Sequence, residues 1–258
     1  MSASPSTSTS TGLRVISLAE RPDLEDALIR MESSWPAYIR PDPLLVDWAL
    51  ARHAEHQLVV LDEEERVVAR AASVPFAWDG DPGSLPDTGW DETLRQCLTD
   101  TSAGRELTAL CALEIAIVPG RLAQNLSVYT LRALIGHARE KGFRDLVGPV
   151  RPSRKDQHPH QPLAEYLALR RPDGLPEDPW LRVHVRVGGE VLKVCPASMT
   201  ISGSLAQWRE WTGLPLDTDG AVELPGALTP LTVNTAHDYA VYVEPNVWVR
   251  HRLTDHRP

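Results

Sequence analysis

A basic loop carries residue types that bind anions. It spans Pro149–Pro162 and places Arg151, Arg154 and Lys155 directly after a short apolar strand pattern. In α/β folds, ligands collect beyond the carboxyl ends of strands, where guanidinium and ammonium groups bind phosphate or carboxylate. The loop therefore predicts a local anion site for a substrate or a cofactor phosphate, with an ordinary solvated loop as the alternative.

Polar residues also interrupt the last apolar strand pattern. The run Tyr239–Arg250 alternates as a strand should, but it contains Glu244, Pro245 and Asn246. Because proline cannot donate a ladder hydrogen bond, we expect a bulge or a sheet edge at Pro245. Such a bulge would aim Glu244 and Asn246 at a cleft, as substrate-binding side chains.

Metal and disulfide chemistry are not indicated by the spacing of the relevant residues. His158 and His160 are two positions apart and have no obvious third ligand nearby. Cys97, Cys111 and Cys195 are widely spaced and form no CxxC pair. We therefore expect neither a metal site nor a disulfide framework, and we expect a reducing cytoplasm as the location.

Length and composition limit the classes of protein to consider. The 258 residues are enough for a single domain with a full hydrophobic core, and no apolar run is long enough to span a bilayer. The net charge of −9 argues against general affinity for nucleic acid or anionic membrane. We expect a soluble protein in which residues 1–12, rich in Ser and Thr, form a disordered tail.

The middle of the chain predicts a strand, a helix and a second strand in succession. Glu106–Val118 has a buried-strand pattern, Pro119 and Gly120 make a turn, and Asn125–Lys141 is an amphipathic helix. Asp145–Val150 is another short apolar strand. A strand, crossover helix and parallel strand form a right-handed βαβ unit, so the fold class is α/β.

The flanking elements are also legible from hydrophobic periodicity. Before this unit we expect a strand, two helices, a hairpin and a short helix, at Leu13–Leu18, Arg21–Trp35, Pro43–Ala54, Gln57–Asp62 with Arg66–Trp78, and Glu92–Leu98. After it we expect a helix, a strand, a helix and the closing strand, at Trp180–Val187, Val191–Ser202, Leu205–Thr212 and Tyr239–Arg250.

This order of elements resembles the GNAT superfamily of N-acetyltransferases. The resemblance is strongest at EIAIVPGRLAQNLSVYTLRALIGHAREKGFRDL, residues Glu114–Leu146, which is similar to the family's central strand, V-x-P, turn and helix. It covers residues 13 to about 202 and the final strand. It implies one GNAT-like domain over residues 13–258, with a mixed twisted sheet, flanking helices and long C-terminal elaborations at Ser153–Pro179 and Gly203–Asp238.

The resemblance implies acetyl-CoA or another acyl-CoA as co-substrate. In the family, a Q/R-x-x-G-x-G/A turn holds the pyrophosphate through backbone N–H groups at the helix N-terminus. The matching window departs from that pattern and keeps only its last small residue, and the preceding strand would contribute two further residues. The implied cofactor-binding set is Ile115, Ile117, Leu122, Ala123, Gln124, Asn125, Leu126 and Ser127.

Two catalytic roles are implied by position within the family motifs. His184, in HVRVGG, stands where many members have a tyrosine that protonates the departing thiolate, and a histidine is a competent acid near neutral pH. Glu114 stands where members often have a general base. The alternatives are a packed histidine on an amphipathic helix, and a solvated or ion-paired strand carboxylate.

The implied function is transfer of an acetyl or small acyl group from acyl-CoA to an amine of a small molecule. The family's acceptor site is built from the first helices, the third strand and the closing strands, which would make Trp78 part of its wall unless that residue packs in the core. A homodimer stays open. The alternatives are a GNAT fold that has lost coenzyme A and uses another small ligand, and a non-enzymatic scaffold.

Overall fold

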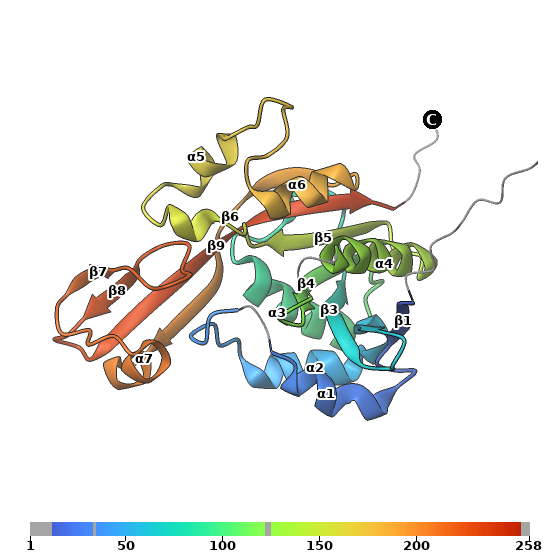
Figure 1. The fold of residues 1–258 in the computed structure, drawn as a ribbon, viewed down its shortest axis with the longest axis horizontal. Helices are drawn as coiled ribbons and strands as arrows, with labels where there is room; N and C mark the ends of the chain where they lie inside the picture. The colour runs from blue at the N-terminus through green and yellow to red at the C-terminus, as the bar shows by residue number, and fades with distance from the viewer. Residues whose placement is uncertain (1–11, 33–34, 122–124, 254–258) are drawn as a thin grey trace, which may run out of the picture.

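The computed structural model describes residues 12–32, 35–121 and 125–253 (Figure 1). The strands are β1 Arg14–Ser17, β2 Leu58–Leu61, β3 Val67–Phe76, β4 Ala109–Ile117, β5 Asp145–Val150, β6 Glu190–Gly203, β7 Gly220–Val222, β8 Leu231–Asn234 and β9 Tyr239–Arg252. The α-helices are α1 Glu25–Arg30, α2 Pro43–Arg52, α3 Gly89–Ser102, α4 Leu126–Glu140, α5 Leu163–Ala168, α6 Pro179–Arg186 and α7 Leu205–Thr212. Short 3-10 helices are η1 Pro22–Leu24, η2 Ala54–His56, η3 Pro82–Ser84 and η5 Lys155–Gln157.

Within the described residues, one mixed sheet of nine strands joins the two halves of the chain. Its order is β1-β2-β3-β4-β5-β9-β8-β7, and β6 pairs with the other edge of β9. β4 and β5 run parallel, and the remaining pairs are antiparallel. The predicted α/β class with a mixed sheet is confirmed. The predicted single domain over residues 13–258 stays a prediction, and residues 1–11 of the predicted tail lie outside the described residues.

Strand β4 places alternate side chains on opposite layers of helices. Ala109 and Cys111 pack into the core cluster that contains residues of α2 and α3, whereas Leu110 packs with Leu134 and Ala138 of α4. This period of two explains why the sequence of β4 is apolar along almost its whole length. Helices therefore cover both faces of the sheet, and the strict alternation holds along β4 up to Ala112.

The C-terminal half is built around a long hairpin. β6 and β9 pair over Glu190–Gly203 and Tyr239–Arg252, and their distal ends carry β7, β8 and α7 as a lobe that projects from the rest of the molecule (Figure 1). The register of the hairpin shifts between Cys195 and Met199, opposite Pro245. The irregularity expected at Pro245 is therefore present, but the extra residues belong to β6.

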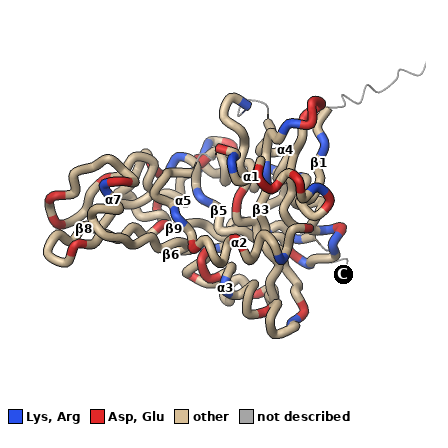
Figure 2. Tube along the Cα trace, turned by 90° about the horizontal axis from the view of Figure 1, so that it is seen from below, with Lys and Arg blue, Asp and Glu red and all other residues tan. Residues whose placement is uncertain are grey.

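Three of the structured segments did not show in the hydrophobic pattern. α5, β7 and β8 have six, three and four residues, too few to display a period. α3 is longer than the expected Glu92–Leu98, because Gly89 and Trp90 at its start are buried against the core. Acidic and basic residues are interspersed along the trace (Figure 2). Among the described helices, none is long and apolar enough to cross a membrane.

Candidate active site

The parallel pair β4 and β5 is joined over a short distance only. Ala109–Cys111 pairs with Asp145–Val147, and beyond this point the two strands share no further ladder. A Cβ atom on Gly148 would lie 2.9 Å from the carbonyl oxygen of Ala112, so the strands are in close contact where the ladder ends. Past this ladder, β4 continues to Ile117 paired with β3 and not with β5.

A β-bulge lies in this part of β4, past the ladder with β5. Ala72 pairs with Glu114 and Ser73 pairs with Ala112, which leaves Leu113 as an extra residue. The Leu113 carbonyl accepts a hydrogen bond from Trp90 Nε1 at 3.0 Å. A bulge re-aims the side chains and backbone groups next to it. The bulge and the end of the ladder occur together, one residue before Glu114.

The N-terminus of α4 provides a second set of backbone donors. Asn125 caps the helix in the left-handed conformation, with φ 56°, and the first turn carries no acidic residue. Asn adopts this conformation more readily than most residues, so it can stand where the family pattern has glycine. A helix of 15 residues that begins here presents the N–H groups of its first turn and a favourable dipole to an anion.

The remaining predicted cofactor residues divide into two groups. Leu122, Ala123 and Gln124 lie outside the described residues. Ile117 is buried in the cluster that contains Leu126, and Ile115 and Ser127 are half-buried, with Ile115 packed beside this cluster. Ile115, Ile117 and Leu126 therefore pack β4 against the start of α4. A direct contact between any of the eight residues and a cofactor stays a prediction.

Glu114 forms a two-point ion pair with its neighbour on β3. Arg70 Nε donates to Oε2 at 2.8 Å and Arg70 Nη2 donates to Oε1 at 3.2 Å. Arg70 also donates to the carbonyl oxygen of Leu28 at the end of α1. The Glu114 side chain keeps 15% of its surface exposed. The carboxylate is thus an ion-paired strand residue that solvent still reaches, on the α1 side of the sheet.

A second carboxylate pair is buried at the carboxyl end of β5. Arg151 Nε donates to Glu244 Oε1 at 2.5 Å, and Glu244 is fully buried. Tyr242 Oη donates to the other carboxylate oxygen, and Asn246 Nδ2 lies 3.5 Å from Oε1. Burial raises the pKa of Glu244, while the Arg151 guanidinium opposes that rise. The structure therefore brings together Arg151, Glu244 and Asn246, three of the predicted substrate-binding residues.

The other two cations of the predicted anion site point elsewhere. Lys155 is completely buried, and its Nζ donates to the carbonyl oxygens of His158 and Leu228 at 2.6 and 2.8 Å. Burial lowers the pKa of this ammonium. Arg154 is exposed and donates its backbone N–H to Asp178. Arg151 and Lys155 are committed to internal contacts, so the three cations do not converge on one anion.

His184 lies inside the protein on α6. Its Nδ1 is 3.1 Å from Nε2 of His251, its ring packs 4.7 Å from the Trp180 ring, and 5% of its surface is exposed. Burial, and to a lesser extent His251, lowers its pKa to about 3. This geometry matches the packed-histidine alternative, and a role of His184 as general acid stays a prediction.

Trp78 packs in the core and anchors a loop. It is 7% exposed, and its Nε1 donates to the carbonyl oxygen of Asp81 at 3.1 Å and to Ser84 Oγ at 3.0 Å. The Arg250 guanidinium lies 6.0 Å from the centre of its ring. The side chain therefore fixes the loop after β3, which matches the core role left open for it, and a contact with the acceptor stays a prediction.

A hollow that the sequence did not reveal opens beside the end of β4. It has a volume of about 530 Å³ and is lined by α1, by the β2–β3 turn and by Val118 and Pro119. Arg30 and Arg66 bring positive charge to it, and Glu32 and Glu65 bring negative charge. The sequence signal at this place is the charged run Glu63–Glu65 between β2 and β3. By itself it indicates a solvated turn, because the sequence does not show that α1 faces it.

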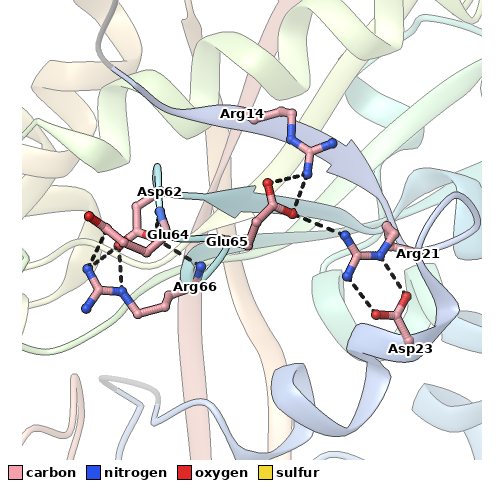
Figure 3. A network of polar contacts seen from close by, with 7 residues as sticks. All are labelled: Arg14, Arg21, Asp23, Asp62, Glu64, Glu65 and Arg66. Atoms are coloured by element: carbon pink, nitrogen blue, oxygen red, sulfur yellow. Dashed lines mark hydrogen bonds and ion pairs between the residues drawn. The ribbon is translucent and has the colours of Figure 1, made fainter.

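Ion pairs fix the turn that forms one wall of this hollow (Figure 3). Arg14 Nη2 lies 2.6 and 2.5 Å from the two oxygens of Glu65, and Arg21 reaches the same carboxylate at 3.2 Å. Arg66 binds Asp62 at 2.8 Å. Exposed pairs of this kind contribute little to stability individually, but together they link β1, η1 and the turn.

One characterised protein is similar to this chain over nearly its whole length. No family model matches the sequence. The chain is 34% identical over 278 residues to the arginine N-acetyltransferase avaD of Aspergillus versicolor, with 94% of each protein covered. An identity of this size over nearly the whole of both chains shows a shared family.

Solved structures share the fold at lower identity. The loading GNATL domain of CurA from Lyngbya majuscula superposes with a TM-score of 0.59 at 16% identity, covering 93% of this chain and 96% of that one. The GphF GNAT-like decarboxylase in complex with isobutyryl-CoA gives a TM-score of 0.56 at 18% identity, covering 94% and 99%. These likenesses concern the arrangement of the sheet and helices.

Proposed function

We propose that this chain, which belongs to the GNAT superfamily of N-acetyltransferases, transfers an acetyl or small acyl group from acyl-CoA to the amine of arginine or of a related guanidinium compound. Membership of the family makes the chain an N-acyltransferase that acts on an amine. The acceptor is the new element of the proposal.

The observation that carries the proposal is the coincidence of three features along β4. The ladder with β5 ends at Cys111, the bulge follows at Leu113, and the strand leads to the left-handed Asn125 at the start of α4. An extended amide-containing arm can lie along the part of β4 past this ladder, and the helix N-terminus can hold a pyrophosphate. An acyl-CoA has both parts, which supports its use as co-substrate.

The chemistry needs a neutral amine and a polarised thioester. Glu114 is the candidate base, acting directly or through water on the acceptor ammonium, since its carboxylate is partly exposed and lies next to the bulge. Backbone N–H groups at the bulge would polarise the carbonyl. Glu114 passes the ammonium proton on to solvent, and the neutral amine then attacks the thioester carbonyl carbon. The C–N bond forms, the C–S bond breaks, and the second nitrogen proton ends on the departing thiolate, directly or through Glu114.

The acceptor is inferred from the relative and from charge. The fungal relative is named for arginine, and the present chain is acidic overall, with 35 Asp and Glu residues against 26 Lys and Arg. A negative protein raises the local concentration of a cationic acceptor. Glu114 is the carboxylate near the bulge that solvent still reaches, so it is also the group that can exchange Arg70 for an incoming cation.

Thiol release from acetyl-CoA in the presence of candidate amines tests this function. We expect turnover with arginine or a guanidinium analogue, giving a product whose mass is increased by one acetyl group. We expect little turnover with an alkylamine of similar length that has no guanidinium group. Calorimetric titration with acetyl-CoA and desulfo-CoA separates binding from chemistry. Turnover with the amine that has no guanidinium group, and none with arginine, would refute the proposed acceptor. Absence of acyl-CoA binding would refute the proposed co-substrate.

Compartment and oligomeric state belong to the same proposal. We place the enzyme in the cytoplasm, since Cys97, Cys111 and Cys195 are all buried free thiols that are at home in a reducing compartment. We propose small molecules as its partners, and a homodimer as the assembly to test by light scattering. A mass equal to the 28.5 kDa of one chain at working concentration would refute the dimer.

A further inference from the structure

The segment joining α2 to β2 gathers three groups that bind transition metals. His53, Glu55 and His56 lie around η2, and one ligand atom from each lies within 4.8 Å of the others. Glu55 Oε1 is 4.0 Å from His53 Nδ1 and 3.6 Å from His56 Nε2. Both separations are too long for hydrogen bonds. Ligands around a tetrahedral zinc ion lie roughly 3.3 Å apart, so small side-chain adjustments would bring these atoms to coordinating distance.

The opposite nitrogen of each ring already has a partner. His53 Nε2 lies 3.3 Å from Thr101 Oγ1 on α3, and His56 Nδ1 lies 3.0 Å from His137 Nε2 on α4. Metal-binding histidines characteristically hold their second nitrogen in a hydrogen bond, which fixes the ring and its tautomer. The two remaining nitrogens therefore face the Glu55 carboxylate from fixed rings.

Burial and backbone contacts make this arrangement rigid. His53 and His56 are 4% and 6% exposed, while the Glu55 side chain keeps 43% of its surface and leaves an approach from solvent. Gln57 Nε2 donates to the His53 carbonyl at 3.0 Å and to the carbonyl of Ser73 on β3 at 2.8 Å, and Ser73 Oγ donates to the His56 carbonyl at 2.7 Å. The main chain on both sides of the ligands is thus tied to β3.

We propose that His53 Nδ1, Glu55 Oε1 and His56 Nε2 bind one divalent transition-metal ion, preferentially Zn²⁺, with water as the fourth ligand. Two imidazoles and one carboxylate suit zinc and disfavour Mg²⁺ and Ca²⁺, which prefer all-oxygen sites. His137 lies about 16 Å along α4 from the helix N-terminus, so the ion is remote from the candidate acyl-CoA turn. Its role is structural: it links the end of α2 to α3 and α4 through Thr101 and His137.

Calorimetric titration of untagged, chelator-treated protein with Zn²⁺ tests the site. We expect one ion per chain, a higher melting temperature with Zn²⁺, and no such rise with Mg²⁺. Glu55→Gln should weaken binding roughly 10- to 100-fold. Because Glu55 is half-exposed, this variant should keep the melting temperature of the metal-free wild type. Glu165→Gln, at an exposed position on α5, is the matched control and should bind as the wild type does.

Cobalt spectroscopy identifies the ligands. Co²⁺ at this site should give visible d–d bands without a thiolate charge-transfer band, and His56→Gln should remove them. The proposal is overturned if wild-type protein binds no stoichiometric zinc at pH 7.5, or if Glu55→Gln and His56→Gln bind it as tightly as the control does. A thiolate charge-transfer band would overturn it as well, by placing the ion on cysteine.

Discussion

Two carboxylate–guanidinium pairs flank the place where β4 and β5 part, and they differ in burial. Glu114 and Arg70 keep 15% and 21% of their side-chain surface exposed, whereas Glu244 is fully buried beneath Arg151. Arg70 binds Glu114 at two points, whereas Arg151 binds Glu244 at one point and Tyr242 Oη binds the other Glu244 oxygen. The difference teaches that burial decides which pair can exchange partners with a substrate and which one holds the structure together.

Breaking the buried pair should have the largest effect. Arg151→Met leaves the Glu244 carboxylate without its cation in a low-dielectric setting, so the free energy of unfolding should fall by about 3 to 5 kcal/mol. Urea denaturation measures the loss. The double variant Arg151→Met with Glu244→Gln should recover much of it, because no unpaired charge then remains. A single variant as stable as the wild type would contradict the structural role of the pair.

Breaking the partly exposed pair should affect rate more than stability. Glu114→Gln should lower kcat by about 10²-fold or more, the scale for loss of a positioned base, with less than about 1 kcal/mol lost in unfolding free energy. Steady-state kinetics with arginine as the acceptor provide the check. Glu106→Gln, whose side chain is 81% exposed, is the control. An unchanged kcat in Glu114→Gln would exclude Glu114 as the general base.

A buried pair without charge extends the comparison. Burial lowers the pKa values of His184 and His251 to about 3 and about 4, below the ordinary 6.5. The unfolded chain therefore binds more protons below pH 6.5, and stability falls as pH decreases from 6.5 toward 4. Each histidine should cost about 2 kcal/mol at pH 5. His184→Phe should show a shallower decrease than the wild type between pH 7 and pH 5.

The matched control for this pH dependence is His237→Gln, because His237 is exposed. Urea denaturation at pH 7 and pH 5 gives the two free energies for each protein. The control should retain the wild-type slope. If His184→Phe also retains it, the ring is not held neutral in the folded protein, and the imidazolium role for His184 becomes tenable again.

The smallest effect is expected at Asn125, where the turn after β4 leads into α4. Asn125 adopts φ 56°, so Asn125→Gly should keep acyl-CoA binding and change stability by less than about 1 kcal/mol. Asn125→Val should cost about 1 to 2 kcal/mol and weaken acyl-CoA binding, since a β-branched residue resists this conformation. Thermal denaturation and calorimetry check the two outcomes. Equal affinity for acyl-CoA in the two variants would show that the conformation at Asn125 does not matter for acyl-CoA binding.

Local patterns predicted the fold well where an element is decided by its own sequence. The strand Asp145–Val150 and the helix Leu205–Thr212 match the expected bounds, because periodicity and the Ser204 cap with its Gln207 partner are local features. Contacts between distant residues were a different matter. Arg151 and Glu244 are 93 positions apart, and no local pattern shows that they meet.

The candidate site was predictable in kind and less so in detail. The family resemblance directed attention to the strand with Glu114 and to the turn at Asn125. The bulge at Leu113 depends on register with β3, and the burial of His184 depends on His251, 67 positions later. A helix pattern cannot distinguish a histidine facing a cleft from one facing the core, since both lie on the inner face of the helix.

Strand β9 also bears on how the chain is made. It pairs with β5, β6 and β8, and all three precede it in the sequence. During vectorial synthesis these strands emerge from the ribosome with open edges and wait for their shared partner, and such edges are sites of aggregation. Completion of the sheet, and with it the burial of Glu244 against Arg151, is therefore a late and long-range folding event.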